Sequence, residues 1–198
     1  MRVIFLDIDG VMNSNIFYEE RYKRRWFKRR IKWPLRNVLT KIKLLKQITS
    51  DNYKTPKNYY TFDYQFKWLI EETCEKKWKW LSDFCNQHDI KICISSVWKN
   101  HFGDKNGRQP ELWEDVLVRL GFKPGTFVGI TNTHKTLRGD EIKDWLDMNP
   151  QVIDYAILDD DSDMLPEQLS KYHQCDSWFG MSPNHIYRIG WQFNLNKF

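Results

Sequence analysis

The 198-residue chain contains no apolar run of about 18 residues, the length that a membrane-spanning helix requires. Its first residues also lack the longer apolar stretch and the small-residue cleavage site of a secretory signal peptide. Low-complexity disorder is disfavoured, because 16% of the residues are aromatic and 10 of them are tryptophan. We therefore expect a folded protein without membrane contact, with a length suited to one domain or to one domain with an insert.

Cysteine is scarce as well. The four that are present lie far apart and form no Cys-x-x-Cys pair: Cys74, Cys85, Cys93 and Cys175. This spacing favours neither a zinc site nor a disulfide scaffold. A reducing, cytoplasmic location is the resulting expectation.

Acidic residues are nearly absent from one segment of the chain. From Glu19 to Lys57 there are 14 Lys and Arg residues against three acidic ones, a local net charge of +11, whereas the whole chain carries +5. The remainder therefore carries −6. We predict a core domain of residues 1–12 and 64–198, interrupted by a basic, aromatic and mostly helical insert of residues 13–63, in which Pro34 and Pro56 exclude one long helix.

Outside the insert, short apolar runs alternate with amphipathic ones. The runs predict strands at 3–6, 90–94, 127–130 and 152–158, a closing strand at 177–179, and helices at 67–87, 112–120, 140–146 and 165–172. Strands separated by helices indicate an α/β fold with a parallel sheet covered on both faces. We interpret Trp98 and Trp178 as core residues.

Three of the predicted strands end directly in polar residues, and in parallel sheets ligands bind at the carboxyl ends of the strands. The residues at these ends are Asp7, Asp9, Ser95, Ser96, Asp159 and Asp160. Carboxylates that close repel one another unless a cation lies among them, and Mg²⁺ prefers such oxygen ligands. One carboxylate could attack phosphorus, a second could transfer protons, and Ser95 with Arg138 or Lys135 could hold phosphoryl oxygens.

These residues lie in segments that resemble the haloacid dehalogenase (HAD) superfamily. Asp7-Ile8-Asp9-Gly10-Val11 is similar to motif I, the strand ending at Ser95 to motif II, and the strand ending at Asp159 and Asp160 to motif IV. More narrowly, residues 95–99, 138–142 and 157–164 resemble the HAD domains of Swiss Army Knife RNA-repair proteins. The resemblance implies a Rossmann-like HAD core with a cap inserted after the first strand.

The resemblance also implies a role for each matching residue. Asp7 would be the nucleophile and a Mg²⁺ ligand, and Asp9 would be the general acid and base, with its backbone carbonyl on the metal. Asp159 and Asp160 would complete the metal site, with support from Asp163. Ser95 would bind the phosphoryl group, with Ser96 as the alternative, and Arg138, or failing that Lys135, would be the motif III cation, where many relatives have lysine.

The basic insert follows motif I, where HAD proteins commonly carry a cap that selects the substrate. Its substrate-binding candidates are Arg24, Arg25, Arg29, Arg30 and Trp26. Basic side chains neutralise backbone phosphates, and aromatic faces stack on unpaired bases, which favours a nucleic acid or nucleotide as the partner. A solvated charged surface or a site for an acidic protein is the alternative. No obligate protein partner is inferred.

Together these features predict a Mg²⁺-dependent phosphatase that forms an aspartyl-phosphate and removes a terminal phosphate from RNA or DNA. A nucleotidase acting on free nucleotides and an inactive nucleic-acid-binding HAD module are the alternatives. A receiver domain of a response regulator shares the acidic pocket, but the order of its residues along the chain is different.

Overall fold

The computed structural model describes residues 1–21, 23, 61–104, 107–131 and 137–195. Its strands are β1 (Arg2–Leu6), β2 (Ile90–Ile94), β5 (Phe127–Ile130), β6 (Asp154–Asp159), β7 (Tyr172–Gln174) and the short pair β3 (Gly103–Asp104) and β4 (Gly107–Arg108). Its helices are α2 (Phe62–Glu72), α3 (Glu75–His88), α4 (Leu112–Arg119), α5 (Arg138–Asp147) and α6 (Pro183–Gln192), with short 3-10 helices at Val97–Asn100 and Pro166–Lys171. Residues 15–21 are helical too. Within these ranges, no helix combines the length and apolarity needed to cross a membrane.

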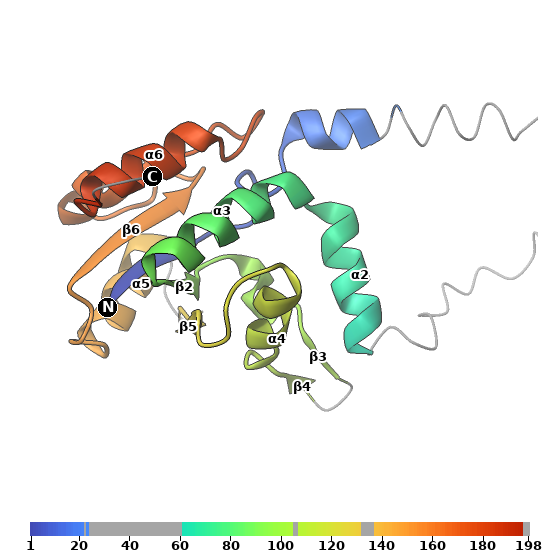
Figure 1. Cartoon of the computed structure of the whole chain (residues 1–198), viewed down its shortest axis with the longest axis horizontal. Coiled ribbons are helices and arrows are strands. Elements are labelled where there is room, and N and C mark those ends of the chain that lie inside the picture. Colours follow the sequence, from blue (N-terminus) through green and yellow to red (C-terminus); the bar gives the residue numbers. More distant parts are fainter. Residues whose placement is uncertain (22, 24–60, 105–106, 132–136, 196–198) are drawn as a thin grey trace, which may run out of the picture.

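Five strands form one sheet in the order β5-β2-β1-β6-β7, and neighbouring strands are parallel (Figure 1). Leu6, the last residue of β1, pairs with Ile94 on one side and Leu158 on the other. The three central strands therefore end at the same level, and the residues that follow them share one edge of the sheet. The predicted α/β fold with a parallel sheet flanked by helices is confirmed.

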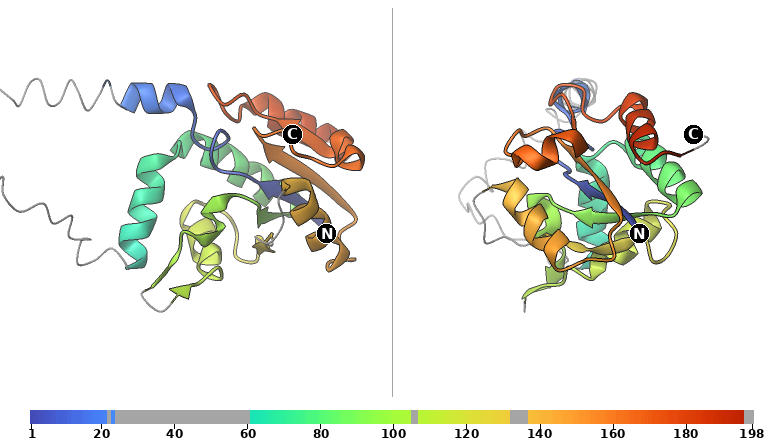
Figure 2. Two further views of the ribbon diagram at one scale, coloured as in Figure 1. Left: turned by 180° about the vertical axis from the view of Figure 1, so that it is seen from behind. Right: turned by 90° about the vertical axis from the view of Figure 1, so that its left-hand side faces the viewer.

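Side chains of β1 alternate between the two faces of the sheet, as the twofold periodicity of a strand requires. Ile4 and Leu6 pack in a core with residues of α3, α4 and α6. Val3 and Phe5 pack in a second core against Trp145 of α5, whose ring meets Phe5 edge-on at 5.3 Å between centroids. Figure 2 shows helices on both sides of the sheet, so β1 is buried on both faces, as its continuous apolar sequence indicates.

The single helix predicted at 67–87 is wrong, because α2 and α3 are separate helices. Thr73 between them has an extended backbone; its hydroxyl donates to the Leu69 carbonyl at 2.7 Å and accepts from the Trp78 indole at 2.8 Å. The Cys74 amide donates to the Met12 carbonyl at 2.9 Å. These contacts replace the intrahelical hydrogen bonds and tie the break to the loop after β1.

The C-terminal part also differs from the prediction. Most of 165–172 is a 3-10 helix, and the strand that closes the sheet beyond β6 is β7, not 177–179. Residues 177–179 instead lie in a turn closed by a bridge between Asp176 and Gly180. Trp178, interpreted as a core residue, is 53% exposed in this turn.

Candidate active site

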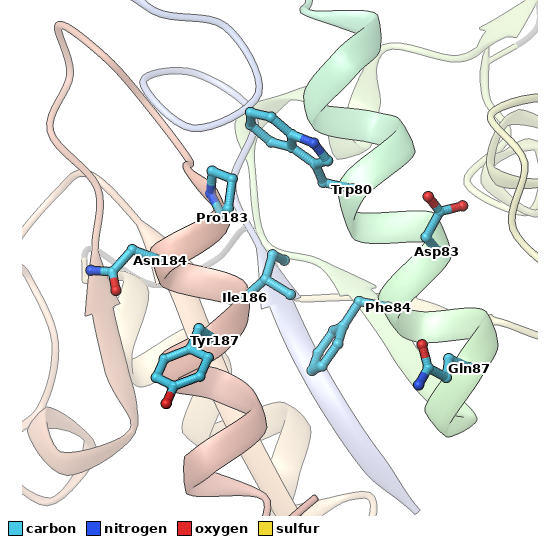
Figure 3. A pocket seen from close by; sticks show the side chains of 8 residues that line it. All are labelled: Trp80, Asp83, Phe84, Gln87, Pro183, Asn184, Ile186 and Tyr187. Atoms are coloured by element: carbon cyan, nitrogen blue, oxygen red, sulfur yellow. The ribbon is translucent and has the colours of Figure 1, made fainter. Parts of the chain in front are cut away.

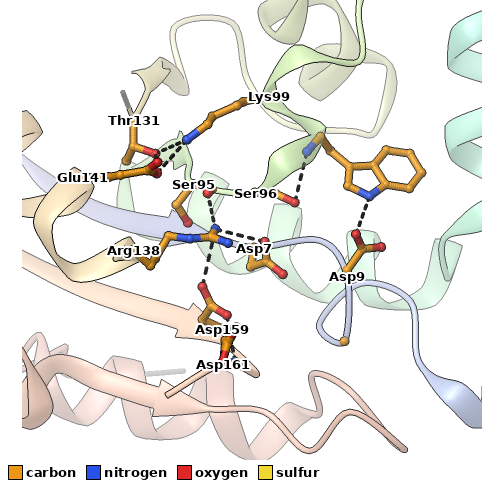
Figure 4. A network of polar contacts seen from close by, with 12 residues as sticks. Asp7, Asp9, Ser95, Ser96, Lys99, Thr131, Arg138, Glu141, Asp159 and Asp161 are labelled. Atoms are coloured by element: carbon orange, nitrogen blue, oxygen red, sulfur yellow. Dashed lines mark hydrogen bonds and ion pairs between the residues drawn. The ribbon is translucent and has the colours of Figure 1, made fainter. Parts of the chain in front are cut away.

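The carboxyl ends of β1 and β6 bring three carboxylates together. Single ligand atoms of Asp7, Asp159 and Asp160 all lie within 4.8 Å of one another, and we call these residues the acidic cluster. Asp7 and Asp159 are buried, and Asp160 is partly exposed. The convergence expected from the strand ends is thus present (Figure 4).

Arg138, the first residue of α5, is the cation that contacts this cluster among the described residues. Its Nη1 lies 3.1 Å from Asp7 Oδ1 and 3.6 Å from Asp159 Oδ2, and it also contacts the Ser95 carbonyl (Figure 4). Asp163 Oδ2 accepts the backbone N–H of Arg138 at 2.8 Å, so it anchors the start of α5. Burial alone would lower the pKa of Arg138, but the Asp159 and Asp7 carboxylates outweigh it and raise that pKa.

Burial disfavours the charged forms of the clustered carboxyl groups. It raises the pKa of Asp7, against the opposing effect of Arg138 and a hydrogen bond from Ser96. Burial, followed by repulsion from Asp7, raises the pKa of Asp159 to about 7. Burial likewise raises the pKa of Asp160. The positive charge of Arg138 therefore does not balance the three carboxylates. A divalent cation would balance the remaining negative charge.

Asp159 Oδ2, in the acidic cluster, and Ser95 Oγ, beside it, are among the buried side-chain atoms that lack a hydrogen-bond partner within the described residues. Most buried polar atoms in proteins are paired, so an unpaired carboxylate oxygen inside a cluster of carboxylates fits a bound cation. Carboxylate oxygens are the donors that Mg²⁺ prefers. The acidic cluster therefore fits a magnesium ion, and Ser95 Oγ is available to a substrate oxygen.

Gly10 allows the loop after β1 to reach the cluster. Its φ is +65°, a left-handed conformation that glycine adopts without strain. A Cβ at this position would overlap the carboxyl group of Asp160. The glycine of the Asp-x-Asp-Gly segment is thus required both by the backbone conformation and by the contact with the acidic cluster.

Asp9 lies beside the acidic cluster with its carboxylate exposed. The Trp98 indole N–H donates to its Oδ2 at 2.9 Å, and Asn13 Nδ2 donates to its Oδ1 at 2.8 Å. Trp98 is buried, as expected of a core residue, but its indole also orients Asp9. The sequence did not indicate this contact or the role of Asn13, because residues 89 positions apart meet only through the sheet.

The two serines after β2 differ in their contacts. Ser96 Oγ accepts the backbone N–H of Trp98 at 3.3 Å, which caps the short helix that follows. Ser95 Oγ has no hydrogen-bond partner within the part of the chain that the structure describes. Of the two hydroxyl groups, that of Ser95 is therefore the one available to a ligand.

A second charged group, which sequence reasoning missed, lies close to Arg138. Lys99 Nζ is 2.7 Å from Glu141 Oε2 and 2.9 Å from Thr131 Oγ1, and Thr131 donates to the same glutamate oxygen at 3.0 Å (Figure 4). All three are buried. Burial lowers the pKa of Lys99, against the opposing effect of the hydrogen bond that Lys99 donates to Glu141. We call these three residues the lysine network.

Several predicted binding residues lie outside the described residues: Arg24, Trp26, Arg25, Arg29, Arg30 and Lys135. Their predicted roles therefore remain predictions.

Comparison with known proteins gave one family. The family described as the HAD domain in Swiss Army Knife RNA repair proteins matches residues 3–186, nearly the whole chain. No curated protein and no solved structure matched. The match includes both strands that supply the acidic cluster, the serine pair after β2 and the start of α5. The chain therefore belongs to the family of HAD domains found in Swiss Army Knife RNA repair proteins.

Proposed function

We propose that this protein is a Mg²⁺-dependent phosphatase that removes a terminal phosphate from nucleic acid through an aspartyl-phosphate at Asp7. The observation that carries the proposal is the acidic cluster, whose ligand atoms lie within 4.8 Å at the strand ends. The family supports this class of chemistry, since its description names RNA repair proteins. Asp7, Asp159, Asp160 and the Asp9 backbone carbonyl would hold Mg²⁺, which would offset the negative charge of the nucleophile and the phosphate.

In the first step, an Asp7 carboxylate oxygen attacks phosphorus, and the bond from phosphorus to the leaving oxygen breaks. Asp9 gives its proton to that oxygen. In the second step, water attacks the phosphorus of the aspartyl-phosphate and transfers a proton to Asp9, which releases inorganic phosphate and restores Asp7. Asp7 directly follows Leu6, the last residue of β1, and Asp9 lies two residues further along the same loop, so both sit at the same edge of the sheet.

Arg138 and Ser95 would bind the phosphoryl oxygens that Asp7 does not contact. The guanidinium lies 3.1 Å from Asp7, and no described residue hydrogen-bonds to the serine hydroxyl. Donors fixed before the reaction stabilise charge that develops in the transition state. Trp98 and Asn13 would keep the Asp9 carboxylate oriented towards the leaving oxygen through their hydrogen bonds.

The nucleic-acid part of the proposal depends on the basic insert. We assign residues 1–12 and 64–198 to the catalytic core and residues 13–63 to a substrate-selecting cap. Its high density of Lys and Arg would attract a polyanion, and this attraction would weaken with salt.

Phosphate release from a panel of substrates tests the proposal. We expect Mg²⁺-dependent release from 3′- or 5′-phosphorylated oligonucleotides, little release from mononucleotides, and loss of at least 10³-fold in Asp7→Asn. Release mainly from mononucleotides would identify a nucleotidase instead. Oligonucleotide binding without release from any substrate would identify an inactive binding module.

A further inference from the structure

The turn at residues 176–180 presents two aromatic side chains to solvent. Trp178 is 53% exposed and Phe179 is 65% exposed. Aromatic residues are enriched on the surfaces by which proteins hold their partners. This pair is therefore a candidate binding surface.

The backbone of this turn is held firmly by its surroundings. Asp176 Oδ1 accepts the Trp178 N–H at 2.8 Å, and the Ser177 and Trp178 carbonyls accept from Asn15 and Ile16 at 3.0 and 3.1 Å. The buried Lys77 ammonium donates to the Phe179 carbonyl at 2.8 Å. The exposed indole is thus presented by a rigid segment, which reduces the entropy lost when a ligand binds.

The turn also lies at the edge of the sheet that carries the acidic cluster. It follows β7, which is parallel to β6, and the Cys175 amide donates to the Asp159 carbonyl at 2.8 Å. On its other side are residues 15–21, drawn in blue beside the loop that precedes α6 in Figure 1. The aromatic turn therefore stands between the acidic cluster and the start of the basic insert.

An open groove of about 570 Å³ lies beside Trp178 and this helical segment, whose first residues bond to the turn. Its lining residues are Asn15, Tyr18, Glu19, Lys23 and Trp178. The volume is in the range of about 300–1,000 Å³ that is usual for small-molecule sites. Asn13 Nδ2 donates both to Tyr18 Oη and to Asp9 Oδ1, each at 2.8 Å, so one side chain connects the groove to the proposed general acid.

We propose that this groove binds the unpaired base of the nucleotide that carries the scissile phosphate, with the base stacked on Trp178. The inference rests on the proposed function and specifies its substrate as a single-stranded nucleic-acid end. The indole offers a face for any base, while Asn15 and Glu19 offer polar groups to the base edge. Lys23, whose Nζ lies 3.2 Å from Glu19 Oε2, provides a positive charge at the groove for an adjoining phosphate.

The control residue, Trp191, lies near a second hollow, an apolar groove of about 510 Å³ between α3 and α6 that is lined by residues such as Trp80, Phe84 and Tyr187 (Figure 3). The rings of Trp191 and Tyr187 meet edge-on at 6.1 Å between centroids. Trp191, near the end of α6, is 64% exposed, and its neighbour Gln192 bonds to Tyr155 at the start of β6. Trp191 thus matches Trp178 in exposure but lies at the opposite end of the strands from the acidic cluster.

The test compares Trp178→Ala, Trp178→Phe and Trp191→Ala on three substrates. These are a phosphorylated single-stranded oligonucleotide, the same oligonucleotide without its terminal base, and ribose 5-phosphate. We expect Trp178→Ala to lower kcat/KM for the complete oligonucleotide about tenfold, with Trp178→Phe close to wild type and Trp191→Ala unchanged. Removing the terminal base should cause the same loss, and Trp178→Ala should add nothing to it.

Equal losses by Trp178→Ala on all three substrates, or no loss on any, would overturn the inference. If the wild-type protein releases phosphate from none of them, the proposed function fails. Binding of a labelled single-stranded oligonucleotide then tests separately whether the groove binds a base. An affinity about tenfold weaker for Trp178→Ala than for Trp191→Ala would support base binding by this groove. Equal affinities would exclude it.

Discussion

The acidic cluster and the lysine network lie side by side at one edge of the sheet, yet their charges are organised differently (Figure 4). In the lysine network, Lys99 and Glu141 pair at 2.7 Å, and Thr131 bonds to both. In the acidic cluster, Asp7 and Asp159 contact Arg138, Asp160 adds a third carboxylate, and Asp159 Oδ2 has no hydrogen-bond partner among the described residues. Both groups are largely buried, so burial alone does not distinguish them.

We infer from this difference that the lysine network stabilises the fold and that the acidic cluster takes part in the chemistry. A matched pair with its hydrogen bonds satisfied needs nothing from outside the chain. An excess of carboxylates with an unpaired oxygen is relieved either by protonation, as the raised pKa of Asp159 indicates, or by a bound cation. We therefore expect substitutions in the lysine network to affect mainly stability, and substitutions in the acidic cluster to affect mainly activity.

The largest effect is expected from Lys99→Met. This change leaves the buried Glu141 carboxylate without the lysine that pairs with it and should lower the free energy of unfolding by about 3–5 kcal/mol. The double variant Lys99→Met/Glu141→Leu, which removes both charges, should recover most of that loss. Urea denaturation measures the free energy of unfolding of both variants. A single variant that is as stable as the wild-type protein but much less active would contradict a purely structural role for Lys99.

Arg138→Met should reverse that pattern. We expect a loss of about 10²–10³-fold in phosphate release, because the guanidinium that contacts Asp7 and Asp159 is also the proposed donor to the phosphoryl group. Arg119→Met is the matched control, since Arg119 forms an exposed ion pair with Asp63 at 2.7 Å. Similar activities for the two variants would show that Arg138 balances charge without taking part in catalysis.

A smaller effect concerns pH in the metal-free protein. The pKa of Asp159 is raised from its ordinary 3.8 to about 7 by burial and by Asp7. Between these values the folded state holds a proton that the unfolded state has lost, so stability falls as the pH rises through the window and levels off above about 7. We expect a decrease on the order of 2 kcal/mol from pH 5.5 to pH 8 in the presence of a chelator.

Asp159→Asn should flatten this slope, whereas Asp161→Asn, a change in an exposed neighbour, should preserve it. Asp7, Asp160 and Arg138 face Asp159, and saturating Mg²⁺ should remove the dependence because the ion favours the charged carboxylates. Thermal unfolding at several pH values measures these slopes. If stability depends on pH equally in the wild-type protein and in Asp159→Asn, the titration of Asp159 is not the cause of the dependence.

Much of this organisation could be predicted from the sequence. Apolar runs such as Val3–Leu6 end in Asp or Ser, and parallel strands place those ends together, so the meeting of Asp7, Ser95 and Asp159 follows from local patterns. The resemblance to the HAD motifs also predicted the order of these residues along the chain and pointed to Arg138 as the cation of motif III.

Contacts between distant side chains could not be predicted. The hydrogen bond from Trp98 to Asp9 and the pair of Lys99 with Glu141 depend on three-dimensional proximity that no local pattern encodes. The break at Thr73 depends on hydrogen bonds to Leu69 and Trp78 that compete with the helix. Helix α6 was missed, although its proline at the first position and Ser182 before it are usual signals of a helix start.

The most direct test of the account is to look for the covalent intermediate at Asp7. The protein is mixed with an oligonucleotide carrying a ³²P-labelled terminal phosphate, quenched in acid and digested, and the labelled peptide is identified. We predict label on the peptide that contains Asp7, more of it in Asp9→Asn because hydrolysis of the aspartyl-phosphate is slowed, and none in Asp7→Asn. Phosphate release by the wild-type protein with no label on Asp7, in either the wild-type protein or Asp9→Asn, would contradict the account.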